Sequence, residues 1–388
     1  MKSATILTLI ILQYLEAVSS DELIGVSVIV NHGATIPSKF YPTDPFRSPY
    51  FWNKPLGELS IIGEQQTYEL GKWLQKRYDR KLQFLTLHYN ASQIFTFSED
   101  RDPSLMSAEC IMAGLYPPVG DEIWNYRINW RPTPVHSAPL FLDNAIGRGV
   151  GCPNYEKILK KVEHGRFFRQ QNREDRALLK YLSLHTGEQF RNIGQIPALY
   201  NILKVEESHN FTLPNWTKSV YPNVLEKVML DVSIFRTKNR ELTRLSIGPI
   251  LDKIQEQFDA IVTNSPNLGN LNMNLRKFKI YVANDTLIYD ILHGLKASPI
   301  EIVPSGASLI FELWRPNSGM DYVKVSYRSS PKSNIPNQHL KMGGCKAVKC
   351  PYSSFNSTLT NLATSEPEWL QLCQTSENGT TSISNNVI

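Results

Sequence analysis

The chain has 388 residues, of which 41% are hydrophobic and 20% are charged, so it can bury one large core or two moderate ones. This composition excludes a chain that is disordered throughout. The formal net charge of +5 is not gathered in a basic run or a basic and aromatic stripe, which argues against a nucleic-acid-binding protein.

The first 20 residues have the pattern of a signal peptide. Lys2 begins a short basic segment, residues 4–15 are mostly apolar, and residues 17–20 are small enough for cleavage. We therefore expect the mature chain to begin near Asp21. The apolar run is shorter than the roughly 20 residues that cross a bilayer, and no later segment is long enough, so we expect no membrane anchor.

Strands alternate with helices in the first and last thirds of the chain. Residues 24–30 form a β-branched run that predicts a strand buried on both faces, and a residue just past it would lie where open α/β sheets bind ligands. Further strands are expected at 93–97, 279–283, 309–314 and 322–327, and helices at 59–78, 105–115, 247–261 and 286–295.

A mainly helical block separates these two parts. It begins with proline-punctuated loops and continues with helical patterns at 155–162, 173–184 and 224–235. The sequence thus predicts an α/β domain made of residues 21–130 and 240–373, interrupted by an α-helical cap at 131–239. Residues 374–388 are rich in Ser, Thr and Asn, which predicts a disordered polar tail.

Cysteines and glycosylation motifs indicate an oxidising compartment. Five cysteines suggest disulfides with one thiol left over. The spacing of Cys345 and Cys350 suits a local bridge better than zinc, since no second Cys or His pair lies close; we expect no metal ion and no cofactor. Asn-x-Ser/Thr motifs fit a secreted or lysosomal glycoprotein and occur at Asn90, Asn210, Asn215, Asn356 and Asn378.

The segment after the first strand reads Asn31-His32-Gly33-Ala34-Thr35-Ile36-Pro37. Other distinctive blocks follow in order: residues 41–45 (Tyr-Pro-Thr-Asp-Pro), 70–71 with 76–78, 104–108 (Ser-Leu-Met-Ser-Ala), 130–137, 209–216, and Cys345 with Cys350-Pro351. Each block alone is weak evidence. Together, in this order and spacing, they resemble the histidine acid phosphatases, and within them the lysosomal and prostatic type.

The resemblance implies an α/β fold with a mostly parallel central sheet flanked by helices, like that of phosphoglycerate mutase, and an inserted smaller α-helical domain. It also implies disulfides between Cys152 and Cys373 and between Cys345 and Cys350, which leaves Cys110 as the free thiol. In this family a histidine attacks phosphate monoesters to give a phosphohistidine, and a carboxylic acid protonates the leaving oxygen. The matching positions are His32 and Asp285.

Four phosphate-binding positions depart from the family pattern. The family loop reads Arg-His-Gly-x-Arg-x-Pro, so Asn31 and Thr35 replace two arginines. Pro103 replaces a third arginine and Asn284 replaces a histidine. Because removing one preorganised donor typically slows catalysis by about 10² to 10³, losing all four should leave phosphate little reason to bind. The opposing hypothesis is that Arg101, Lys39 or Arg47 supplies a relocated cation.

Simpler structural roles remain open for several of these residues. His32 could be a turn histidine, and Asp285 could be the N-cap of the helix that follows it. His136, in the 130–137 block, could serve packing near the pocket wall. Residues 284–286 also form a glycosylation motif, but a strand end that faces a cleft would be a poor acceptor.

The sequence therefore favours a secreted or lysosomal glycoprotein whose phosphatase site is degenerate, a pseudoenzyme or a very weak enzyme. One alternative is an active acid phosphatase that works through His32. Another is a non-catalytic interaction glycoprotein. The expected partners are a small phosphorylated or neutral ligand and a second copy of the chain in a homodimer.

Overall fold

The computed structural model describes residues 21–263, 276–297, 302–332 and 334–374, apart from the side chain of Arg236. The expected signal peptide, almost all of the expected disordered tail, and Asn378 lie outside the described residues. Within the described part, no helix is long and apolar enough to cross a membrane.

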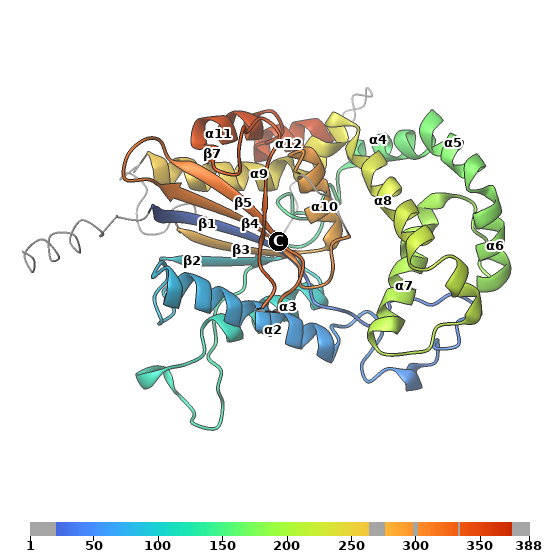
Figure 1. Ribbon diagram of the computed structural model, residues 1–388, viewed down its shortest axis with the longest axis horizontal. Coiled ribbons are helices and arrows are strands. Elements are labelled where there is room, and N and C mark those ends of the chain that lie inside the picture. The colour runs from blue at the N-terminus through green and yellow to red at the C-terminus, as the bar shows by residue number, and fades with distance from the viewer. Residues whose placement is uncertain (1–20, 264–275, 298–301, 333, 375–388) are drawn as a thin grey trace, which may run out of the picture.

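Seven strands form one sheet in the order β2-β3-β1-β4-β5-β6, with β7 paired to β5 (Figure 1). Strands β2, β3 and β1 are parallel to one another, whereas β4 to β7 pair antiparallel. The strands are β1 (Glu22–Asn31), β2 (Ile94–Ser98), β3 (Phe278–Ala283), β4 (Ser308–Arg315), β5 (Tyr322–Arg328), β6 (Gln338–Leu340) and β7 (Cys350–Pro351).

The α/β class is confirmed, but the sheet is mixed where the sequence predicted a mostly parallel one. Strands β4 and β5 are joined by residues 316–321 alone. A connection of this length can join only antiparallel neighbours, because a parallel pair needs a crossover of a dozen or more residues. The parallel half of the sheet is the half that ends in the His32 loop.

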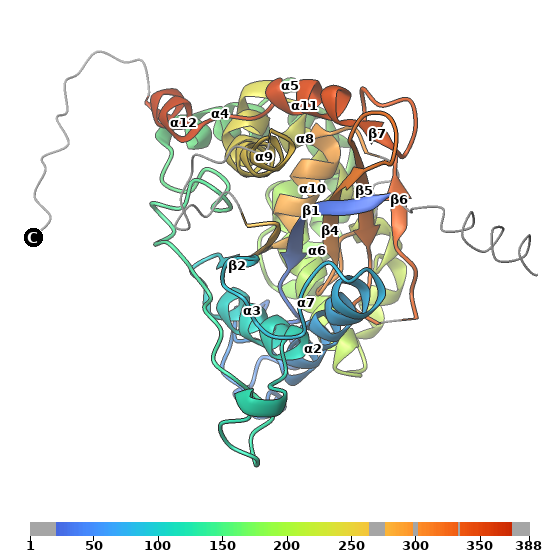
Figure 2. The same ribbon diagram turned by 90° about the vertical axis from the view of Figure 1, so that its left-hand side faces the viewer.

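Helices cover both faces of the sheet, as Figures 1 and 2 show. On one face, Leu70 of α2 and Ile111 of α3 pack against Val28 in one core cluster. On the other face, Ile29 packs in a second cluster with Phe258 of α9. Successive side chains of β1 thus enter opposite cores, as the two-residue period of a strand requires. These helices are α2 (Ile61–Gln75), α3 (Asp102–Leu115), α9 (Arg240–Val262), α10 (Asp285–Gly294), α11 (Tyr352–Thr360) and α12 (Glu366–Cys373).

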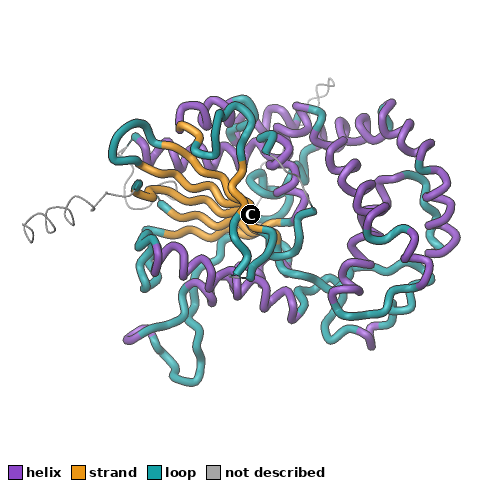
Figure 3. Tube along the Cα trace, in the orientation of Figure 1, coloured by secondary structure: helices purple, strands orange, loops and turns teal. Residues whose placement is uncertain are grey.

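A group of helices without strands stands beside the sheet (Figure 3). It contains α4 (Pro153–Glu163), α5 (Arg166–Glu174), α6 (Arg176–Thr186), α7 (Ile196–Ser208) and α8 (Asn223–Thr237). The helix predicted at 173–184 is two helices that meet at Asp175. Helix α7 was not predicted. Pro197 lies in its first turn, where the backbone N–H that proline lacks would have no partner within the helix, so proline is compatible with a helix start there.

The cysteine pairs lie where the resemblance places them. Cys152, just before α4, is bonded to Cys373 at the end of α12, so this disulfide ties the helical group to the C-terminal segment. Cys345 is bonded to Cys350, and Cys110 on α3 is free and half-buried.

The described glycosylation motifs differ in their surroundings. The side chains of Asn90, Asn210 and Asn215 are exposed. Asn356 is half-buried, and its amide donates to Asp259 Oδ1 at 3.2 Å. Asn356 is therefore a less accessible acceptor for glycosylation than the other three positions.

Candidate active site

The site is built at the carboxyl ends of two neighbouring parallel strands, β1 and β3. Asn31, the last residue of β1, is paired with Ala283, the last residue of β3. The backbone N–H of His32 donates to the Ala283 carbonyl at 3.0 Å. Asp285 begins helix α10 two residues later. The sheet register thus brings His32 and Asp285 together although they are far apart in the sequence.

Helices α2 and α3 hold the His32 loop in place. The N–H of Gly33 donates to Ser107 Oγ at 3.0 Å, and the N–H of Ala34 donates to Gln66 Oε1 at 3.0 Å. A Cβ on Gly33 would come within 2.3 Å of the Gly63 carbonyl oxygen, so only glycine allows α2 to approach this closely. The backbone around the histidine is therefore fixed by packing as well as by hydrogen bonds.

The orientation of His32 suits a nucleophile. Its Nδ1 lies 2.8 Å from the Gly33 carbonyl oxygen. Because a carbonyl only accepts, Nδ1 must carry the proton in the neutral ring, and Nε2 keeps its lone pair. The histidine is partly exposed and lines a cavity. This part of the family chemistry is structurally intact.

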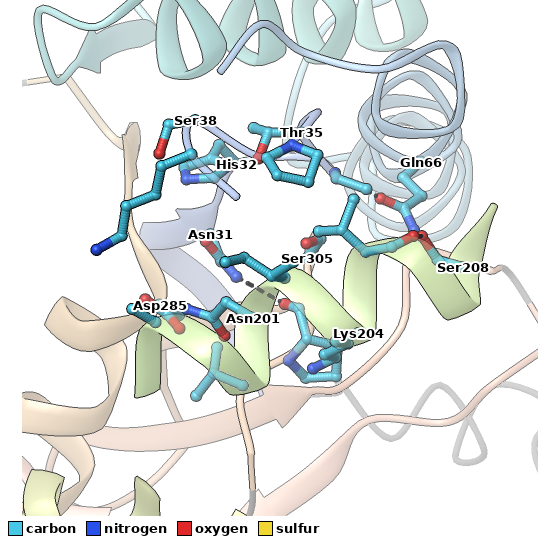
Figure 4. A pocket seen from close by; sticks show the side chains of 18 residues that line it. Asn31, His32, Thr35, Ser38, Gln66, Asn201, Lys204, Ser208, Asp285 and Ser305 are labelled. Carbon is cyan, nitrogen blue, oxygen red and sulfur yellow. Dashed lines mark hydrogen bonds between the residues drawn. The ribbon is translucent and has the colours of Figure 1, made fainter. Parts of the chain in front are cut away.

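The cavity has a volume of about 450 Å³ and lies between the strand ends and helix α7 (Figure 4). The loop after β1 contributes Asn31, His32 and Thr35, and α10 contributes Asp285. Helix α7 lines the opposite wall with residues spaced as one helical face: Ala198, Asn201, Ile202, Lys204, Val205 and Ser208.

Two of the four replaced positions use their side chains within the fold. Asn31 is 4% exposed, and its Nδ2 donates to the Pro304 carbonyl at 2.9 Å, which ties the amide to the fold and leaves at most one N–H for a ligand. Asn284 is the N-cap of α10, where its Oδ1 accepts from the Leu287 N–H at 3.2 Å. Asp285 is thus the first residue of the helix and not its N-cap, which corrects that structural alternative.

The other two positions supply no charge. Thr35 lines the cavity with a neutral hydroxyl. Pro103 lies in the first turn of α3, and its carbonyl accepts from Ser107 Oγ at 2.6 Å. Pro103 is not among the residues that line the cavity. None of the four positions therefore presents a cation beside His32.

Of the three cations considered for rescue, only Lys39 lines the cavity. Arg101 is mostly exposed and pairs with the buried Glu99 at 2.9 Å. Arg47 donates to the Pro42 carbonyl at 2.7 Å. Both arginines are therefore directed elsewhere.

A second cation, Lys204, was missed by the sequence reasoning. It lines the cavity from α7 and is half-buried. Burial lowers the pKa of Lys204, while the negative charges of Asp285, Glu226 and Glu207 limit this fall. The cavity is therefore not neutral, because two lysines and one aspartate line it. No sequence signal marked Lys204, because α7 itself was not predicted.

A buried carboxyl pair lies behind the α7 wall. Glu206 is fully buried and Asp44 is 3% exposed. Burial, followed by the charge of Asp44, raises the pKa of Glu206 to about 9. With its pKa raised in this way, Glu206 stays protonated at neutral pH. The segment that carries Asp44 also contacts α6, because the Thr43 N–H donates to the Thr186 carbonyl at 3.1 Å.

His136 has a packing role. Its ring stacks on Phe95 with centroids 4.9 Å apart, and its backbone N–H donates to the Thr96 carbonyl at 2.9 Å. Burial and the charge of Arg276 lower the pKa of His136. It does not line the cavity. Within the described residues, no group of three His, Cys, Asp or Glu side chains could hold a metal ion.

Comparisons with known proteins show which chains this one resembles. The model of the histidine phosphatase superfamily (branch 2) matches residues 31–328. The chain is 31% identical to lysosomal acid phosphatase of Xenopus laevis, covering 92% of this chain and 80% of the relative. It is 29% identical to prostatic acid phosphatase of Rattus norvegicus, covering 92% and 91%. Among solved structures, the apo form of Hafnia alvei phytase has a similar fold, with a TM-score of 0.67 at 17% identity, covering 92% of this chain and 99% of the phytase.

Proposed function

Because the chain belongs to branch 2 of the histidine phosphatase superfamily, we propose that it is an acid phosphatase-like protein whose catalytic activity is impaired. The main support is Asn31, which stands at an arginine position of the family loop, carries no charge, and donates through its Nδ2 to the Pro304 carbonyl. A phosphoryl group accepts hydrogen bonds and carries negative charge, so it needs donors and cations at this position.

The size of the effect follows from the number of positions involved. Losing one preorganised donor costs about 10² to 10³ in rate, and arginine contacts to phosphate are among the strongest hydrogen bonds in proteins. Contributions of groups that act together do not add. Even the loss expected for one position would reduce turnover a hundredfold, and here Asn31, Thr35, Pro103 and Asn284 all lack the family residue.

Two observations favour an active acid phosphatase as the second candidate. The Nδ1 contact to the Gly33 carbonyl leaves Nε2 of His32 free to attack. Lys39 and Lys204 also give the cavity more positive than negative charge. In this alternative, His32 would form a phosphohistidine and Asp285 would protonate the leaving oxygen. A third candidate, a non-catalytic interaction glycoprotein, has no feature of the cavity in its favour.

The similarity to lysosomal acid phosphatases supports a secreted or lysosomal location. The expected signal peptide and the exposed motifs at Asn90, Asn210 and Asn215 support the same location. We propose that the working environment is oxidising, in keeping with the two disulfides.

Turnover of 4-nitrophenyl phosphate by the purified protein tests the proposal. The assay should run from pH 4 to 7 beside a His32→Ala control, because Ala removes the nucleophile without adding a charge. We expect little or no difference between the two proteins. Robust turnover that disappears in His32→Ala would establish the active phosphatase instead.

A further inference from the structure

Lys204 is a half-buried cation that forms no direct ion pair with a carboxylate of the described residues. Asp285 lines the same cavity, and the negative charges of Asp285, Glu226 and Glu207 act on Lys204 without direct contact. Its ammonium group lies over the Tyr200 ring, 5.8 Å from the centroid. Burying a charge is costly unless the charge is paired. This position therefore lowers the stability of the unliganded fold, and an anion in the cavity would remove the cost.

The cation on α7 lies away from the nucleophile. Figure 4 shows Lys204 on α7 across the cavity from His32. Lys39, the other cation, is exposed at the cavity surface. Asn31 and Thr35, the positions beside His32, are neutral. An anionic group that is drawn to Lys204 is therefore held across the cavity from the histidine.

The donors also limit what the ligand can be. An ammonium group is a point charge with three donors and no fixed plane, so it binds carboxylates as well as phosphates. Amide and hydroxyl groups complete the walls, among them Asn201, Ser208 and Ser305. A small polar organic acid meets both requirements.

We propose that the cavity binds a small molecule with an acidic group, carboxylate or phosphate, through Lys204 and Lys39, and holds it without cleavage. This inference rests on the proposed loss of catalysis and names the ligand class of the same site. It makes Lys204 a specificity-determining residue in place of the arginines that the His32 loop lacks.

Calorimetric titration with three phenyl compounds tests the inference. Phenyl phosphate and benzoate carry the two acidic groups, and benzyl alcohol is the neutral control. We expect both acids to bind and the alcohol not to bind. Lys204→Met should weaken both acids about 10- to 100-fold, the range for losing a charged hydrogen bond. Lys227→Met, which removes an exposed lysine of α8, is the matched control and should leave the affinities unchanged.

Two further measurements separate this role from a structural one. Lys204→Met should unfold at the same or higher temperature than the wild type, because it removes an unpaired buried charge, and Lys204→Arg should keep most of the binding. Binding that survives Lys204→Met would overturn the inference. Release of phosphate from phenyl phosphate, followed in the same samples, reports separately on the proposed loss of catalysis.

Discussion

The buried pair of Glu206 and Asp44 should make the fold more stable in acid than at neutral pH. The pKa of Glu206 is raised from 4.5 to about 9 in the folded chain. Between these two values the folded state holds a proton that the unfolded state releases, so the free energy of unfolding falls as pH rises. The contribution is fully present below about pH 4.5 and is lost by about pH 9.

The structure sets the size of this effect. Glu206 is fully buried, so solvent does not screen it. From pH 4.5 to pH 7 the linkage amounts to roughly 3 kcal/mol, at 1.36 kcal/mol for each pH unit. Glu206→Gln remains neutral at every pH and nearly keeps the size of the side chain. In this variant, the free energy of unfolding should therefore lack the fall of roughly 3 kcal/mol between pH 4.5 and pH 7.

Urea unfolding at pH 4.5, 6 and 7.5 measures the difference directly. Ionisable groups away from the pair contribute equally to wild type and variant, so the gap between their two curves reports on Glu206 together with Asp44, whose titration is linked to it. Glu207→Gln is the matched control, because Glu207 is the next residue of α7, is exposed, and accepts from Tyr221 Oη at 2.7 Å. Parallel curves for wild type and Glu206→Gln would refute the raised pKa of Glu206.

Two other predictions concern the framework around the site. Gly33→Ala would place a Cβ 2.3 Å from the Gly63 carbonyl oxygen. We therefore expect displacement of the His32 loop and a loss of about 1–3 kcal/mol in unfolding free energy, measured by thermal and urea unfolding. Unchanged stability would contradict the close packing. Replacing Cys152 and Cys373 together by Ser removes a crosslink that spans 221 residues. We expect the free energy of unfolding to fall by about 2–5 kcal/mol, measured by urea unfolding beside the reduced wild type. Stability equal to that of the oxidised wild type would show that the bridge contributes nothing.

The sequence predicted the parts of the site that depend on local pattern. The β-branched run before His32 predicted a buried strand, and β1 is buried along most of its length. The replaced residues Asn31 and Asn284 were visible because they lie next to His32 and Asp285 in the sequence. Their hydrogen bonds to Pro304 and Leu287 were not, since these depend on the final backbone geometry.

The parts that were missed come from long-range packing. Lys204 reaches the cavity only because α7 lies across from the strand ends, and nothing in the local pattern indicates which helix of the cap faces the site. The same is true of Glu206, whose partner Asp44 is far away in the sequence. The mixed sheet was missed because apolar strands read alike whether their neighbours are parallel or antiparallel.

The most direct test of the central claim is to restore the family residues by making Asn31→Arg, Thr35→Arg, Pro103→Arg and Asn284→His in one protein. The measurement is kcat/KM for 4-nitrophenyl phosphate, compared with the wild type and with the same restored protein carrying His32→Ala. If the scaffold, His32 and Asp285 are still in register, activity should rise by at least about 10² to 10³ and should depend on His32. A wild type already as active as the restored protein would contradict the account, and so would a folded restored protein without any gain.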